Sequence, residues 1–231
     1  MNPELRRSAA HVFVEMIDAP QLTDEDAHHL GRVLRLRAGE QVSVSDGAGR
    51  WRMCTFTAAT GVPLESFTPV QQDAPPQPPI TVGFALAKGD RPEWIVQKLT
   101  EIGIDRIVLV DATRSIVRWD PAKAVRNLER LGKVAREAAM QSRRTWLPQI
   151  AGPFALADLA VDGVAIAEPD GPPLEGWVHT LLVGPEGGWA EAELAVAPRR
   201  VGLGNTILRV ETAAVVAAAQ LVALRDRSAT Q

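Results

Sequence analysis

The apolar positions of the chain follow two different patterns, and the change falls near residue 75. Before it, three short runs have the alternation and residue types of β-strands: 11–14, 41–45 and 51–57. Between the last two runs, Asp46-Gly47-Ala48-Gly49 is typical of a hairpin turn. One helix is expected over residues 23–34, with Thr23 as its N-cap. These elements predict a small β-rich, barrel-like domain.

After residue 79, buried strands alternate with amphipathic helices, which indicates a mostly parallel sheet covered by helices. Strands are expected at 80–86, 106–110, 163–168 and 179–184. Helices are expected after Asp90, after Asp120, near Ala190 and over 210–224. Trp94 is expected on the buried face of the first helix. The last helix is apolar almost all round, so it is expected in the core or in a subunit interface.

The clearest break in the chain is a proline-rich stretch. Four of the five residues 75–79 are proline, which excludes helix and favours extended backbone. We therefore expect an N-terminal domain over 1–72, a linker over 73–79 and an α/β domain over 80–231.

Composition excludes several classes of protein. With 231 residues, 46% of them hydrophobic and 23% charged, the chain can fold into one or two domains. Its single cysteine, Cys54, and its four histidines favour neither a disulfide framework nor a structural metal site. We find no apolar run of membrane-spanning length and no signal-like N-terminus, so we expect a cytoplasmic protein without a membrane partner.

The net charge of −3 conceals two segments of opposite sign. Residues 113–150 carry nine basic and three acidic residues, a net +6, whereas residues 151–195 carry eight acidic and no basic residues. A local concentration of positive charge is what contacts with nucleic-acid phosphates require. The same pattern also fits a helix with one solvated charged face, and the sequence leaves both interpretations open.

Three stretches near the C-terminus are candidates for a ligand site: 167–171, 182–188 and 201–213. The first two follow predicted strand ends, where open α/β sheets bind ligands, and their glycines let the backbone approach a planar group. The glycine patterns of dinucleotide and triphosphate sites are absent. A nucleoside with a cationic centre, such as S-adenosylmethionine, suits the acidic segment better than a pyrophosphate. A simple tight turn before the next helix is the alternative for 184–188.

The sequence resembles the bacterial 16S ribosomal RNA uridine-N3 methyltransferases, a branch of the SPOUT superfamily. The resemblance rests on Gly184-Pro185-Glu186-Gly187-Gly188 followed by the segment 203–214, and on the further stretches 29–35, 97–103 and 137–148. It extends over nearly the whole chain. One departure is Asn205-Thr206, where the family pattern has a basic residue.

This resemblance implies a PUA-like RNA-binding domain, an α/β domain tied in a trefoil knot, and a homodimer. It implies methylation by S-adenosyl-L-methionine of N3 of uridine 1498 in 16S rRNA of the 30S subunit. The expected cofactor-binding residues are Ala167, Glu168, Val183, Gly184, Pro185, Glu186, Gly187, Gly188, Leu203, Gly204, Ile207, Leu208 and Thr212. The expected RNA-binding residues are Arg32, Arg35, Arg37, Arg114, Arg118, Arg126, Arg130, Arg136, Arg143 and Arg144. No metal is implied.

The expected catalytic residues are Arg209 and Glu211. A guanidinium can stabilise the uracil anion that forms when N3 loses its proton, and a carboxylate two residues on could orient that guanidinium or accept the proton. An ion pair that only fixes the loop to the last helix is the alternative. For the protein as a whole, the alternatives are methylation of tRNA or of a ribose 2′-hydroxyl, and a non-catalytic ribosome-binding module.

Overall fold

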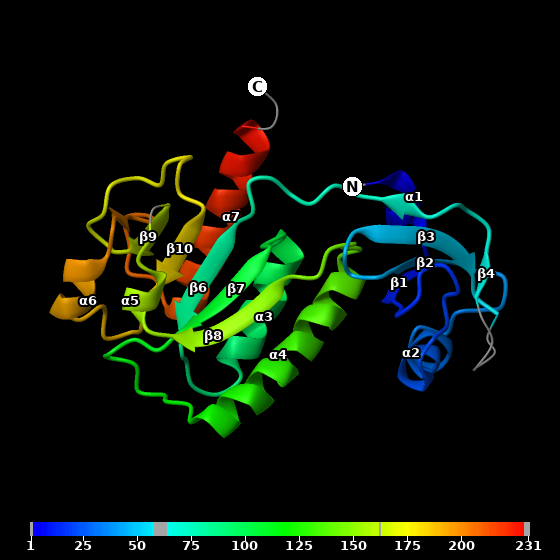
Figure 1. Ribbon diagram of the computed structural model, residues 1–231, viewed down its shortest axis with the longest axis horizontal. Coiled ribbons are helices and arrows are strands. Elements are labelled where there is room, and N and C mark those ends of the chain that lie inside the picture. Colours follow the sequence, from blue (N-terminus) through cyan, green and yellow to red (C-terminus); the bar gives the residue numbers. More distant parts are fainter. Residues whose placement is uncertain (1, 58–63, 162, 229–231) are drawn as a thin grey trace. The chain divides into compact units, whose positions relative to one another are not determined.

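The computed structural model describes residues 2–57, 64–161 and 163–228, and these form two compact units (Figure 1). The first unit comprises Met1–Pro75 together with Arg136–Leu147, and the second comprises Pro76–Ala135 together with Pro148–Gln231. The first division lies inside the proline-rich stretch. The assignment of 136–147 to the first unit differs from the domain boundaries expected from the sequence.

The first unit is built on a five-stranded sheet. Its elements are α1 (Pro3–Arg7), β1 (Ala10–Phe13), β2 (Gln41–Ser45), β3 (Arg50–Thr55), β4 (Glu65–Ser66) and β5 (Gln71–Gln72). The strand order is β1-β2-β3-β4, with β5 also paired to β3, and only β1 and β2 run parallel. The three strands expected from the sequence are therefore confirmed, although the last ends at Thr55. Residue 57 was the expected end.

The expected helix over 23–34 forms in two parts, α2 (Asp24–His28) and the π-helical turn η1 (His29–Val33). Thr23 caps it as expected, because its Oγ1 accepts a hydrogen bond from the Asp26 amide at 3.1 Å. Arg35, just beyond η1, has a φ of 56°, which is uncommon for a residue with a side chain. Wide turns and positive φ values of this kind are frequent at functional sites.

Polar contacts fix residues 136–147 onto the first unit. The Arg136 guanidinium pairs with the Asp26 carboxylate at 2.9 Å and donates to the Phe13 carbonyl at 3.0 Å. At the other end, the Thr145 hydroxyl donates to the Asp73 carboxylate at 2.7 Å. The sequence could not show this, because each contact joins residues at least 70 positions apart.

His11 is a buried part of the same attachment. Its Nε2 lies 3.0 Å from the Arg144 carbonyl oxygen and its Nδ1 lies 2.8 Å from Ser43 Oγ. A carbonyl oxygen only accepts, so Nε2 carries the proton and Nδ1 accepts from the Ser43 hydroxyl. Burial, with a smaller contribution from the Arg143 charge, lowers the pKa of His11 to about 4.

The lowered pKa predicts that the first unit loses stability in acid. Between pH 6.5 and about 4 the unfolded chain binds a proton at His11 that the folded chain does not, so stability falls as the pH falls. The expected loss is on the order of 3 kcal/mol over this interval. Denaturant unfolding between pH 7 and 4 measures it, and His11→Gln should flatten the pH dependence. The control His28→Gln, at an exposed position, should retain it.

The second unit contains a six-stranded parallel sheet. Its strands are β6 (Thr81–Ala85), β7 (Arg106–Val110), β8 (Gln149–Phe154), β9 (Val164–Ala167), β10 (Thr180–Val183) and β11 (Arg200–Val201). Their order is β11-β9-β10-β6-β7-β8. The four strands expected from the sequence are confirmed. The two edge strands, β8 and β11, were not expected: β8 contains a proline and β11 has only two residues.

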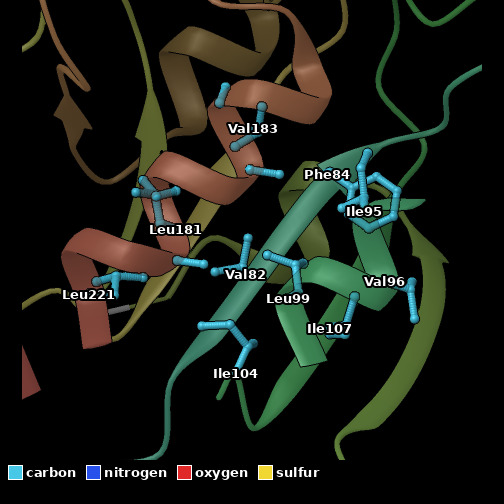
Figure 2. Close-up of a cluster of buried hydrophobic side chains, with 14 of the residues drawn as sticks. Val82, Phe84, Ile95, Val96, Leu99, Ile104, Ile107, Leu181, Val183 and Leu221 are labelled. Carbon is cyan, nitrogen blue, oxygen red and sulfur yellow. The ribbon is translucent and has the colours of Figure 1, made fainter. Parts of the chain in front are cut away.

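The helices of this unit lie on both faces of the sheet. They are α3 (Arg91–Ile102), α4 (Pro121–Gln141), α5 (Leu156–Leu159), α6 (Glu191–Val196) and α7 (Val210–Ser228). Alternate residues of each strand point to opposite faces. Val82 and Leu181 therefore pack with side chains of α3 and α7 (Figure 2), whereas Leu182 packs on the other face with the cluster that includes Trp189.

One residue occupies a place other than that expected. Trp94 is 44% exposed, because α3 turns Ile95 and Leu99 toward the sheet. The last helix, α7, buries one face in the unit's own core, where Leu221 is 2% exposed (Figure 2). For that face the prediction of burial in the core is confirmed.

Candidate functional site

The connections that follow β9, β10 and β11 meet at one edge of the sheet. Parallel strands end on the same side, so the expected cofactor segments are brought together by topology. The Glu168 amide donates to the Val201 carbonyl at 2.9 Å, and the Trp189 indole donates to the Ala167 carbonyl at 3.3 Å. Segments far apart in the sequence thus share one site.

Two glycines permit an unusually close backbone contact there. A Cβ on Gly171 would lie 2.5 Å from the Val201 carbonyl carbon, and one on Gly202 would lie 2.5 Å from the Gly171 carbonyl oxygen. The Gly202 amide also donates to the Pro172 carbonyl at 2.7 Å. Only glycine fits these two positions without displacing the backbone.

A cavity of about 570 Å³ lies between these loops and α7. Its volume is within the range typical of small-molecule sites. It is lined by Gly171, Pro173, Leu174, Gly202, Leu203, Gly204, Asn205, Ala219, Gln220, Ala223, Leu224 and Arg227. Of the expected cofactor residues, Leu203 and Gly204 line it.

The other expected cofactor residues lie outside this lining. Glu168 and Val183 are in the neighbouring connections, while Ile207 is 81% exposed and Thr212 is exposed on α7. The sequence does not predict the wall formed by the C-terminal half of α7. A helix of alanines, valines and leucines gives no signal for which face borders a cavity, although Gln220, whose side chain donates to the Leu203 carbonyl at 3.3 Å, breaks that pattern.

The glycine-rich turn 184–188 is held from several sides. Gly184 packs against the Trp189 ring so closely that a Cβ would lie 2.9 Å from it, and Gly188 has a φ of 69°. Gly184 and Pro185 are buried, whereas Glu186 and Gly187 are exposed at the tip. The turn is therefore an ordered feature of the site with an exposed polar tip.

The expected catalytic pair does not form a contact. Arg209 is exposed just before α7, and its carbonyl accepts from the Ala213 amide at 2.8 Å. Glu211 is half-buried, and its Oε2 is buried without a partner among the described residues. Within this part of the chain there is no Arg209–Glu211 ion pair, so neither the expected orientation of Arg209 by Glu211 nor the alternative of a loop-fixing pair is observed.

Nine of the ten arginines expected to bind RNA fall into two groups. Arg32, Arg35, Arg37 and Arg126 are exposed, and their guanidinium groups have no hydrogen-bonding partner in the described ranges. Intramolecular partners hold five others: Arg114 (Gly187 carbonyl), Arg118 (Asp111), Arg130 (Glu93), Arg136 (Asp26) and Arg143 (Ser8 carbonyl). Arg144 is half-buried.

Two of these arginines, Arg136 and Arg143, are half-buried in the attachment of 136–147 to the first unit, and burial lowers the pKa of Arg143. Their guanidinium groups make intramolecular contacts there, and their role in binding RNA stays a prediction.

Among the described residues, no group of histidine, cysteine, aspartate or glutamate side chains is arranged to hold a metal ion. Within the same ranges, no helix combines the length and apolar character needed to cross a membrane.

Comparison with known proteins identifies the class. Residues 74–222 match a family described as an RNA methyltransferase domain, and residues 22–61 match an RNA methyltransferase PUA domain. The combination is that of an RNA methyltransferase with an N-terminal PUA domain, which confirms the expected fold class.

Similar proteins identify the family within this class. The ribosomal RNA small subunit methyltransferase E of Mycobacterium bovis is 34% identical over 224 residues, which cover 88% of this chain and 86% of the relative. The protein of that name in Bacillus subtilis is 30% identical over 226 residues, covering 85% and 86%. The chain therefore belongs to the ribosomal RNA small subunit methyltransferase E family, as the resemblance indicated.

Solved structures share the fold. A probable rRNA-methyltransferase from Porphyromonas gingivalis aligns with a TM-score of 0.76 and 26% identity, over 95% of this chain and 99% of that one. The ribosomal RNA small subunit methyltransferase E from Neisseria gonorrhoeae, bound to S-adenosyl methionine, aligns with a TM-score of 0.78 and 24% identity, over 93% and 97% of the two chains.

Proposed function

We propose that this protein transfers the methyl group of S-adenosylmethionine to N3 of a uridine in 16S rRNA, with uridine 1498 as the target that the family resemblance implies. The observation that carries the proposal is the cavity beside Leu203 and Gly204, formed by the connections that follow β9 and β11 together with α7, in a chain of this family. Two structures with this fold have S-adenosylmethionine bound.

The residues of the site fit this cofactor. Backbone groups of 202–204 can approach a planar adenine because two of the three residues are glycine. Leu174, Leu203 and Leu224 supply apolar surface.

The chain's own residues must make uracil N3 nucleophilic. Bound S-adenosylmethionine supplies an electrophilic methyl group on sulfur. N3 loses its proton before or during transfer, and the resulting charge spreads onto the two carbonyl oxygens of the base. Arg209 adjoins the cavity loop in sequence, and its exposed guanidinium has no hydrogen-bonding partner among the described residues, so it can donate hydrogen bonds to these oxygens as their charge develops. Glu211, one of whose carboxylate oxygens also has no partner in the described part of the chain, is the nearest candidate in sequence to accept the proton.

The experiment that tests the function maps the product. Purified protein, radiolabelled S-adenosylmethionine and 30S subunits from a strain that lacks its own enzyme of this family should give one methylated uridine, modified at N3, in 16S rRNA. Modification of tRNA or of a ribose hydroxyl would replace the proposal with another methyltransferase activity. If the purified protein does not bind S-adenosylmethionine stoichiometrically, it would be a non-catalytic ribosome-binding module.

We also propose a homodimer that uses α7, and a knotted chain, as the family resemblance implies. Val215 and Val216 are half-buried and Ala219 is exposed on α7, so an apolar strip remains available to a second copy. Sedimentation should give a dimer at micromolar concentration, and Val216→Arg should shift it toward monomer. A stable wild-type monomer would contradict the dimer.

A further inference from the structure

Two arginines bind the exposed tip of the glycine-rich turn 184–188. Arg91 Nη1 lies 2.6 Å from Glu186 Oε1, and Arg114 Nη1 donates to the Gly187 carbonyl at 3.1 Å. Arg91 begins α3, after β6, whereas Arg114 follows β7. Both arginines therefore lie in connections at the carboxyl edge of the sheet, on the same side as the cavity loops.

Hydrogen bonds hold in place the segment after β7 that carries Arg114. The amide of Thr113 donates to Glu193 Oε1 at 2.7 Å, and the other oxygen of this buried carboxylate accepts from the Ala190 amide at 2.8 Å. Ala190 directly precedes α6. The backbone that carries Arg114 is thus tied to the segment that follows the glycine-rich turn.

The contact between Arg91 and Glu186 is exposed and easily exchanged. Their side chains are 40% and 51% exposed, in contrast to the structural pair Arg225–Asp105, whose side chains are 11% and 15% exposed. Exposed ion pairs contribute little net stability, because water solvates each partner when the pair opens. Another anion can therefore take the place of the Glu186 carboxylate at small cost.

The chemistry of the two arginines suits a phosphate. A guanidinium presents its N–H donors in the same planar arrangement to a carboxylate and to a phosphate. The turn itself belongs to segment 151–195, which contains no lysine or arginine, so positive charge beside it has to come from other connections. The Glu186 carboxylate is therefore an anion bound by Arg91 at the tip of the turn 184–188.

We propose that Arg91 and Arg114 form a subsite for a backbone phosphate of the RNA substrate, in which the Glu186 carboxylate occupies the anion position until RNA binds. The inference rests on the proposed function. When RNA displaces Glu186, the turn 184–188 loses its contact with α3, so RNA binding and cofactor binding are energetically coupled. By linkage, the factor by which RNA changes cofactor affinity equals the factor by which cofactor changes RNA affinity.

The test compares two variants that break the same ion pair. Fluorescence anisotropy measures binding of a fluorescein-labelled polyuridine oligonucleotide over a series of salt concentrations. Arg91→Gln should weaken binding and reduce the magnitude of the salt slope by about one. Glu186→Gln should strengthen binding roughly two- to fivefold, because Arg91 no longer has an internal competitor. The double variant should bind like Arg91→Gln. Arg106→Gln, which removes an exposed arginine at the opposite edge of the sheet, is the matched control and should change neither quantity appreciably.

Failure of the phosphate subsite and failure of the proposed function give different experimental results. Equal weakening by both variants, or no change in either, would overturn the subsite. So would loss of S-adenosylmethionine affinity in Arg91→Gln without loss of RNA affinity, since that result assigns the arginine to the cofactor. A wild-type protein that does not bind polyuridine overturns it as well. Calorimetric binding of S-adenosylmethionine to the wild-type protein, without RNA, tests the proposed function independently.

Discussion

Arg209→Ala is expected to lower the rate of single-turnover methylation by about 10²–10³-fold, with little change in affinity for S-adenosylmethionine. A donor that stabilises charge developing in the transition state contributes on this scale. Arg209→Lys should restore little of the rate, because an ammonium offers neither the planar donor pair nor its fixed geometry. Rapid-quench measurement with saturating cofactor and 30S subunits reports the chemical step, and calorimetry reports cofactor affinity.

The control variants distinguish a catalytic role of Arg209 from a general effect of removing one positive charge. Arg106→Ala removes an exposed arginine of the same unit at the amino end of β7 and should retain the rate. Glu211→Gln tests proton acceptance, because it keeps the shape of the side chain while removing its basicity. If Arg209→Ala retains a near-normal rate, another residue or water stabilises the anion.

Gly204→Val is expected to weaken binding of S-adenosylmethionine roughly 10- to 100-fold, on the scale of the strain at such a backbone position. Gly204 has a φ of 152° and lines the cavity, and no atom lies within 4 Å of an added Cβ. The Cβ of a valine therefore meets no neighbour in the folded protein. The backbone strain at this φ lowers stability with or without ligand, whereas the loss of cofactor affinity comes from the side chain that occupies space at the ligand site.

A matched glycine tests the specificity of this effect. Gly176 is exposed, has no neighbour within 4 Å of an added Cβ and has no positive φ, so Gly176→Val should leave cofactor affinity and thermal stability nearly unchanged. Gly188→Val, at a φ of 69°, should behave like Gly204→Val if the turn 184–188 contributes to the site. Unchanged calorimetric affinity in folded Gly204→Val would mean that the cavity is not the cofactor site.

Much of the architecture could be predicted from local sequence. Runs such as 107–110 consist of β-branched and aliphatic residues, as in a buried strand, and they alternate with helices capped by Asp120 or ended by Gly103. Caps, turns and hydrophobic periodicity act over a few residues, so the sequence displays them directly. The glycines of 184–188 were recognisable for the same reason: their backbone requirement is local.

The tertiary structure decided what depends on residues distant in sequence. Whether Arg136 binds RNA or Asp26 cannot be determined from charge, since 110 positions separate the pair in the chain. Contacts between distant residues also decide three other features: the assignment of 136–147 to the first unit, the cavity wall provided by α7 and the exposure of Trp94. The sequence alone established most of the longer strands and helices and the glycine-rich turn, but not the edge strands β8 and β11. Only folding determined which charges neutralise one another and which remain available to a ligand, because that depends on proximity in space.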